Sequence, residues 1–132
     1  MCLFCSIAKH EIEVNIAFEN ENIIAFLDIA PINEGHVLVV PKMHFLDADE
    51  IPNELLDEIM HLSKKIVCSI KKIYNPDGYS IMQNGGKFND IGHYHMHIFP
   101  RYDNDGFGWT ESGKEQKTGA DIADKIKRNL LY

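Results

Sequence analysis

Apolar residues recur along this chain with two different periods, which predict strands and helices in different places. In residues 15–28, two short apolar runs flank a polar stretch, which is typical of a β-hairpin. Residues 36–40 form a mostly β-branched run that a proline follows, and they predict a further strand. Two more strands are predicted at residues 79–84 and 93–100, where apolar and polar side chains alternate.

The clearest helix is predicted for residues 52–74. Its apolar residues fall on one broad face, with carboxylates near its start and lysines near its end, as the helix dipole favours. A second helix is predicted for residues 120–131, where Ile122, Ile126 and Leu130 are spaced by four. Strands, a long helix and then further strands in hairpin-like succession predict an α+β fold with an antiparallel sheet.

Composition narrows the classes of function. The chain has 132 residues, with 13 Lys and Arg against 20 Asp and Glu, and its net charge of −7 argues against a nucleic-acid groove. No apolar stretch approaches the roughly 20 residues that a membrane helix needs, and the N-terminus lacks the pattern of a signal peptide. Three cysteines do not pair evenly, which favours free or metal-bound thiols. We therefore expect a cytoplasmic protein with no membrane or nucleic-acid partner.

Three histidines at alternate positions, His93, His95 and His97, form the most informative pattern. In a strand they would line one face, while the apolar residues between them enter the core. Charged rings this close together repel each other, so most of them are expected to be neutral at pH 7. Neutral imidazole serves as a nucleophile, a general base or a metal ligand, and the periodicity alone leaves catalysis and metal binding open.

Residues 93–99 resemble the His-φ-His-φ-His-φ-φ signature of the histidine-triad (HIT) superfamily, where φ is an apolar residue. Further stretches resemble family landmarks in the same order: residues 26–29, then residues 35–42, then Asn84. The bacterial Hit and Hint-like branch is the most similar.

The likeness covers about residues 2–102 of a single domain that spans residues 1–132, with residues 103–132 as a tail and helix. It implies a five-stranded antiparallel sheet with one long helix, in a protein that pairs into a two-fold homodimer.

The resemblance also implies a nucleotide-binding hydrolase that cleaves at the α-phosphorus of nucleoside phosphoramidates, adenylated compounds or dinucleoside polyphosphates. His95 is similar in position to the nucleophile that forms a nucleotidyl-histidine intermediate, and His97 to the residue that contacts the phosphate and assists the leaving group. His36 resembles a supporting histidine on a neighbouring strand. A purine nucleotide is the expected ligand, and the implied contacts are Phe4, Ile7, Phe26, Asp28, Ile29, Asn84, Asn89, Asp90, His95 and His97.

Among these contacts, Asp28 would bind the ribose, Asn84 the phosphate or ribose, and the apolar residues the base. Each has a plainer alternative, because Asp28 also suits a turn cap, Asn84 a loop cap, and the apolar residues an ordinary core.

The loop at residues 85–92 departs from the family pattern, which often has Gly-Gln-Ser or Gly-Gln-Thr here. Asn89 falls at the glutamine and Asp90 at the hydroxyl residue, and an ionised aspartate only accepts hydrogen bonds and repels phosphate. Either Asp90 turns away, or backbone amides and Lys87 hold the phosphate. The phosphate contacts and the leaving group therefore stay open.

Cys2 and Cys5 form a C-x-x-C pair, which by itself fits a zinc half-site, a redox pair or chance. Several bacterial HIT proteins resemble this chain in completing such a site with two histidines, which here are His44 and His93. The resemblance thus implies structural Zn²⁺ at these four residues. A site with four protein ligands is closed, so the metal is not expected to do the chemistry.

The other histidines, cysteine and tryptophan match no landmark. Cys68, His10 and His61 are interpreted as surface residues, and Trp109 either packs near the substrate or anchors a core. Three alternatives to the hydrolase remain: a nucleotidyltransferase or phosphorylase of the same superfamily, a non-catalytic purine-nucleotide-binding protein, and a metalloprotein with His95 and His97 as ligands.

Overall fold

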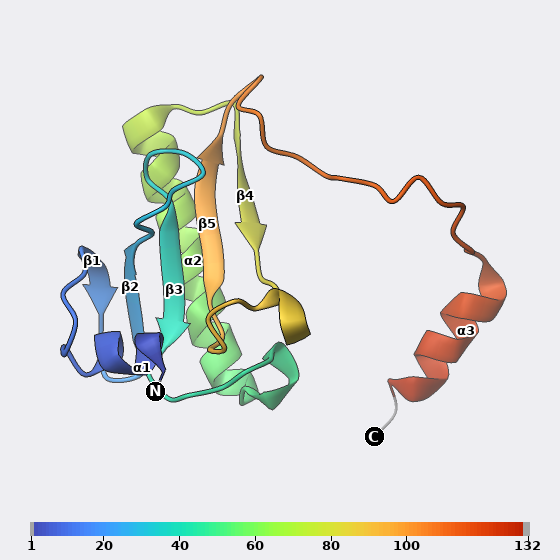
Figure 1. Ribbon diagram of the computed structural model, residues 1–132, viewed down its shortest axis with the longest axis horizontal. Coiled ribbons are helices and arrows are strands. Elements are labelled where there is room, and N and C mark those ends of the chain that lie inside the picture. The colour runs from blue at the N-terminus through green and yellow to red at the C-terminus, as the bar shows by residue number, and fades with distance from the viewer. Residues whose placement is uncertain (1, 131–132) are drawn as a thin grey trace.

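The computed structural model describes residues 2–130 and contains one five-stranded antiparallel sheet in the order β1-β2-β3-β5-β4 (Figure 1). The strands are β1 (Ile16–Glu19), β2 (Ile23–Leu27), β3 (Val37–Pro41), β4 (Gly78–Met82) and β5 (Met96–Arg101). The helices are α1 (Leu3–Ala8), α2 (Asn53–Tyr74) and α3 (Ala120–Asn129), with short 3-10 turns at Ala48–Glu50 and Gly86–Phe88. The predicted α+β class and antiparallel sheet are confirmed.

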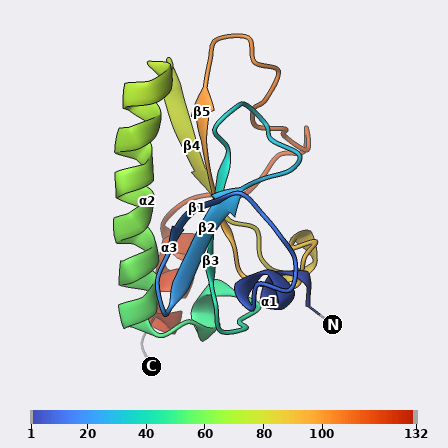
Figure 2. The same ribbon diagram turned by 90° about the vertical axis from the view of Figure 1, so that its left-hand side faces the viewer.

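The sheet separates two layers. Figure 2 shows α2 along one face of the sheet and α1 with the long loops on the other. The side chains of β2 alternate between the two faces of the sheet and contribute to both hydrophobic clusters. Ile23 and Ala25 belong to the cluster beneath α2, and Ile24 and Phe26 to the cluster beneath α1. This strand is therefore buried on both faces.

Strand β5 lies between β3 and β4 and divides its side chains in the predicted way. Met96 and Ile98 are buried in the α2 layer, so His97 and Phe99 belong to the opposite face. The ladder begins at Met96, three residues later than predicted, because the backbone amide of Tyr94 donates instead to the carbonyl of Phe45 at 2.7 Å.

Helix α2 matches the predicted helix to within one residue and buries Ile59, Leu62, Val67 and Ile70 against the sheet. It ends at Asn75, which adopts the left-handed conformation at φ 44° and donates its amide to the carbonyl of Lys71. Tyr74, the last residue of α2, packs against a position in the loop before β3 that requires glycine. Gly35 has a φ of +90°, and a Cβ there would lie 2.5 Å from the Tyr74 ring.

After β5 the chain leaves the body of the protein as an arm that ends in α3 (Figure 1). Asp105 anchors the start of the arm, because its carboxylate accepts from Arg101 Nε at 2.7 Å and from Arg101 Nη2 at 3.0 Å. Residues 108–130 are all exposed. Trp109 is fully exposed, so it packs neither near the cavity nor in a core, contrary to both expectations. The predicted helix is confirmed at residues 120–129, and its expected last residue lies outside the described part of the chain.

Candidate active site

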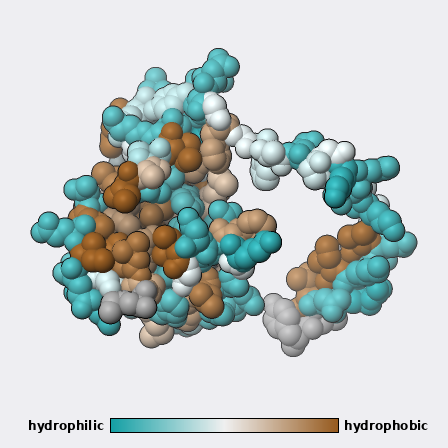
Figure 3. Space-filling model, in the orientation of Figure 1, coloured by the Kyte–Doolittle hydropathy of each residue, from teal (hydrophilic) through white to brown (hydrophobic). Residues whose placement is uncertain are grey.

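A cavity of about 520 Å³ opens on the α1 side of the sheet, within the size range of small-molecule sites. Hydrophobic side chains gather on this face of the body in Figure 3. The lining comes from α1 and the segment after it, strands β2, β3 and β5, the end of β4, the loop after β2, the loop before β5, and the start of the arm. It includes all but one of the predicted catalytic and nucleotide-binding residues, namely Phe4, Ile7, Phe26, Asp28, Ile29, His36, Asn84, Asp90, His95 and His97.

The apolar end of the cavity is a slot beside His95. Phe4, Ile7 and Phe26 form it and are almost fully buried. The Phe4 ring meets Phe26 edge to face at a centroid distance of 5.4 Å and His95 at 5.2 Å. Ile29 lies at the rim with 94% of its surface exposed. The slot therefore offers an apolar surface next to a buried imidazole.

The position of the proton on His95 follows from one hydrogen bond. Its Nδ1 lies 2.8 Å from the backbone carbonyl oxygen of His93, an acceptor, so Nδ1 carries the hydrogen and donates it. The lone pair is then on Nε2, which is the arrangement that a nucleophilic histidine needs.

A second chain of hydrogen bonds fixes the protons on His36 and His97. The backbone amide of Ile32 donates to His36 Nδ1 at 3.0 Å, so the hydrogen of neutral His36 is on Nε2. That nitrogen donates to His97 Nδ1 at 2.9 Å, which leaves His97 with its hydrogen on Nε2. His97 is thereby set as a donor, the complement of His95.

Burial keeps this pair of rings neutral, as predicted. Burial and, to a smaller extent, the neighbouring His95 and His36 lower the pKa of His97 to about 4, although the negative charges of Asp28 and Asp90 act in the opposite direction. Burial also lowers the pKa of His36, which Asp28 partly opposes. At pH 7 the cavity therefore holds these two histidines uncharged.

One carboxylate oxygen of Asp28 caps a turn, and the other faces the histidines of the cavity. Its Oδ1 accepts from the amide of Ala30 at 2.9 Å, which is the turn-capping arrangement. Its Oδ2 lies 3.5 Å from His36 Nε2 and 4.0 Å from His97 Nδ1. These three residues have the spacing of metal ligands, but the proton on His36 Nε2 favours a hydrogen-bonded group, and His95 is not one of the three.

Asn89 is the one predicted nucleotide contact that does not line this cavity. Its side chain instead organises the loop before β5, because Nδ2 donates to the carbonyl of Leu46 and Oδ1 accepts from the amides of Ile91 and Gly92. The side chain that resembled a phosphate ligand from its position in the sequence is already occupied by these bonds.

A second cluster brings together the four predicted zinc ligands, Cys2, Cys5, His44 and His93, with all ligand atoms within 4.8 Å of one another. His93 Nδ1 lies 3.3 Å from Cys2 Sγ and 3.6 Å from Cys5 Sγ, and His44 Nδ1 lies 3.3 Å from Cys5 Sγ. A tetrahedral zinc ion requires sulfur–nitrogen separations of about 3.6 Å. The four residues therefore fit the metal in both chemistry and spacing.

The outer nitrogen of His93 supports this fit. His93 Nε2 lies 2.7 Å from the carbonyl oxygen of Pro41, so Nε2 carries the hydrogen and Nδ1 is free to be a ligand. The remaining residues without a landmark are on the surface as predicted, since Cys68, His10 and His61 are exposed.

Some residues that line the cavity were not predicted from the sequence. Phe99 follows His95 and His97 at the same period of two, so its place on this face was available from the alternation. Phe107 lines the cavity because the Asp105 anchor turns the chain back, and its ring meets Phe99 edge to face at 5.3 Å. The Asn104-Asp105-Gly106 stretch signals a turn, but no pattern in the sequence shows that this turn brings Phe107 to the cavity.

Comparison with known proteins agrees with this geometry. A family model described as HIT domain matches residues 9–104, and the chain belongs to this family. It is 35% identical over 135 residues to the adenosine 5'-monophosphoramidase of Saccharomyces cerevisiae, covering 98% of this chain and 80% of that protein. These matches place the chain in the HIT family, and the yeast relative carries a phosphoramidase activity in its name.

Solved structures give the same result. A HIT family protein from Bacillus anthracis superposes with a TM-score of 0.86 at 32% identity, covering 98% of this chain and 94% of that one. A Zn-bound histidine triad family protein from Mycobacterium smegmatis has a TM-score of 0.75 at 30% identity, covering 86% and 84%. In addition, none of the helices within residues 2–130 is long and apolar enough to cross a membrane.

Proposed function

We propose that this protein hydrolyses nucleoside 5'-phosphoramidates and related adenylated compounds, with His95 as the nucleophile. The observation that carries the proposal is the opposite polarity of two neighbouring rings, whose centroids lie 4.8 Å apart. His95 presents a lone pair on Nε2, while His97 presents a hydrogen on its own Nε2. The apolar slot beside His95 suits a purine, and the yeast phosphoramidase relative has the corresponding activity in its name.

The reaction would proceed in two steps. His95 Nε2 attacks the α-phosphorus, the phosphorus–nitrogen bond of the substrate breaks, and the departing amine, held by a hydrogen bond from His97 Nε2–H, takes up one proton from solvent. Water then attacks the phosphorus of the nucleotidyl-His95 intermediate, which releases the nucleoside monophosphate, restores neutral His95 and returns the proton to solvent. Covalent catalysis of this kind divides one difficult displacement into two easier ones.

The test compares two histidine substitutions. His95→Asn is expected to lower kcat for adenosine 5'-phosphoramidate by at least about 10³-fold, because the amide cannot form the covalent intermediate. His61→Asn, at an exposed position on α2, is the matched control and should retain full activity. Intact-mass spectrometry of the quenched wild-type reaction should detect the adenylylated protein. Full turnover by the His95→Asn protein would refute the proposal.

We further propose that Zn²⁺ occupies the site of Cys2, Cys5, His44 and His93, where it would fasten α1 and the segment before β5 together. Thiolate ligands of this type favour a reducing compartment, which fits the expected cytoplasmic location. Protein purified without chelator should contain one zinc per chain by elemental analysis. Cys2→Ser should lose it and Cys68→Ser, on exposed α2, should keep it. A metal-free wild-type protein would contradict the assignment.

A two-fold homodimer is the assembly that we propose for this chain. Apolar side chains remain exposed on α2 at Met60 and Ile73, and on the edge strand β4 at Tyr79 and Ile81. Light scattering after size exclusion should give twice the 15.1 kDa mass of the chain.

A further inference from the structure

The charged side chains that line the cavity are all acidic. They are Glu13, Asp28 and Asp90, and no lysine or arginine from the described residues joins them. Proteins that bind phosphate-rich ligands usually hold them with arginine or lysine, which form charge-assisted hydrogen bonds to the oxygens. This cavity therefore has no cationic side chain with which to balance a polyphosphate.

The histidines do not replace the missing cations. Because burial lowers the pKa of both His36 and His97, these rings are neutral at pH 7 and can supply hydrogen bonds but no full positive charge. One α-phosphate is within the capacity of such neutral donors, whereas each added phosphate brings further negative charge into a site that already contains carboxylates.

The loop before β5 supplies little compensation. Lys87, which the sequence suggested as a source of charge, has its Nζ 5.6 Å from the centroid of the Phe88 ring and does not line the cavity. Most backbone amides of the loop already donate to groups of the protein itself, and Asp47 accepts one of them at 2.9 Å. The amides engaged in this way are those of Gly86, Phe88, Asn89, Ile91 and Gly92.

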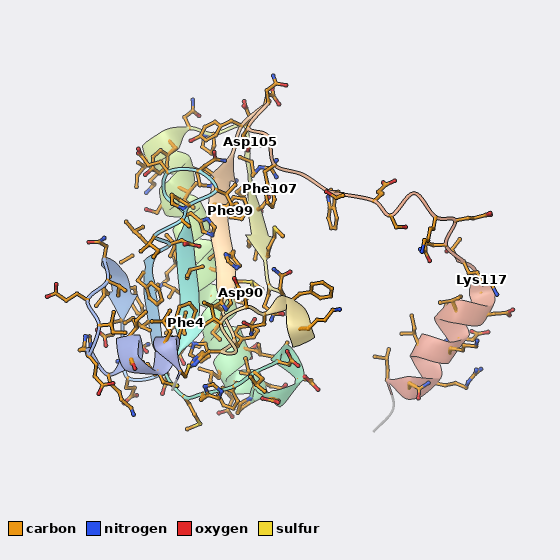
Figure 4. All side chains as sticks on the ribbon, viewed as in Figure 1. Phe4, Asp90, Phe99, Asp105, Phe107 and Lys117 are labelled. Atoms are coloured by element: carbon orange, nitrogen blue, oxygen red, sulfur yellow. The ribbon has the colours of Figure 1, made fainter. Side chains whose placement is uncertain are left out.

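Asp90 lines the cavity together with His95 and His97. Figure 4 shows it between Phe4, which belongs to the apolar slot, and the pair Phe99 and Phe107, and all four line the same cavity. Asp28 lies next to His36 and His97, so both carboxylates are near the histidine that would contact the leaving group. The negative charge of Asp90 is close enough to act on His97, because it opposes the effect of burial there.

We propose that Asp90 selects the leaving group: the protein cleaves nucleotides whose leaving group is a neutral or positively charged amine and discriminates against anionic ones, including polyphosphates. This inference rests on the hydrolase function proposed above and narrows its substrate class. The group transferred and the bonds made and broken are the same as in the two steps described there.

Three adenosine 5'-phosphoramidates of nearly equal size test the proposal. Their amines are ethylenediamine, propylamine and β-alanine, which carry a positive, a neutral and a negative end. We expect kcat/KM to be highest for the cationic or neutral substrate and about tenfold lower for the β-alanine substrate, from one charge pair at an intermediate effective dielectric. A diadenosine polyphosphate should be slower again. The differences should shrink as salt is raised.

Variants at Asp90 separate its contribution from that of the other carboxylates. Asp90→Asn, of nearly the same shape, should reduce the ratio of cationic to anionic kcat/KM by about tenfold. Asp90→Ser, which removes the same charge, should act in the same direction. Asp57→Asn removes the same charge from an exposed position on α2, which lies on the opposite face of the sheet, and should leave the ratio unchanged.

Each outcome bears on a different claim. Equal rates for the three amides, or a preference for the anionic one, would overturn the charge selection while leaving the hydrolase function intact. An unchanged ratio in both Asp90 variants, or an equal change in Asp57→Asn, would remove the role of Asp90. If the wild-type protein cleaves none of the substrates, the proposed function itself fails, and this inference fails with it.

Discussion

Each histidine of the cavity has one ring nitrogen held by a partner, and that bond decides what the other nitrogen can do. The carbonyl of His93 holds Nδ1 of His95, and the amide of Ile32 holds Nδ1 of His36. Alternation along the strand was enough to predict that the three rings share a face. The tautomers were beyond prediction from the sequence, because both partners are backbone groups whose positions only the fold determines.

At this scale we predict that His97 makes the protein sensitive to acid. Its pKa is about 4 in the folded protein against about 6.5 when unfolded, so the unfolded state binds more protons in between, and stability falls as the pH falls from 6.5 toward 4. The loss amounts to at most about 3.5 kcal/mol at about 1.4 kcal/mol per pKa unit. Urea unfolding at pH 7 and pH 4.5 should show a smaller loss for His97→Asn than for wild type. An equal loss in both proteins would contradict the prediction.

Helix α1 links the proposed zinc site to the apolar slot. Six residues long, it carries Cys5, and Cys2 caps it by accepting from the Cys5 amide, while Phe4 and Ile7 from the same helix wall the slot. The long helix α2 was predictable from its periodicity, but α1 was not. A segment this short shows no reliable period, and its contacts and cap stabilise it more than helix propensity does.

We therefore predict that the metal ligands affect nucleotide affinity more than turnover. In Cys2→Ser, α1 is no longer fastened to His93, so Phe4 forms the wall of the apolar slot in only part of the molecules. If the helix is docked in about a tenth of them, the Kd for AMP rises about tenfold. Isothermal titration calorimetry measures this, with Cys68→Ser as the control. An unchanged Kd for AMP in zinc-free Cys2→Ser would show that the proposed zinc site does not affect nucleotide binding.

The whole molecule consists of a packed body and an arm that does not contribute to its core. The class of fold could be predicted, because strands and helices have different hydrophobic periods. The order of the strands could not, since β5 is inserted between β3 and β4 through contacts between residues about 60 positions apart, such as Val37 and Ile98. Nor does the sequence show that the amphipathic α3 stands away from the sheet.

Removal of the arm is predicted to leave the body stable. A chain truncated after Gly108 loses no buried residue, because every described residue beyond it is exposed, and it retains the Asp105 anchor. We expect its Tm to lie within about 3 °C of the full-length value by calorimetry. A larger decrease would show that the arm packs against a surface in solution, and light scattering of the truncated chain would then reveal whether that surface is on a second copy.

The position of β5 between β3 and β4 has a consequence for the synthesis of the protein. Until residues 96–101 have emerged from the ribosome, β3 and β4 each lack their neighbour, and their backbone groups remain as unpaired edges. The same strand ends the segment that carries His93, His95 and His97, so a nascent chain has no partial activity to gain by folding early. A premature stop codon before this strand should yield an aggregation-prone polypeptide that depends on chaperones, rather than a weakened enzyme.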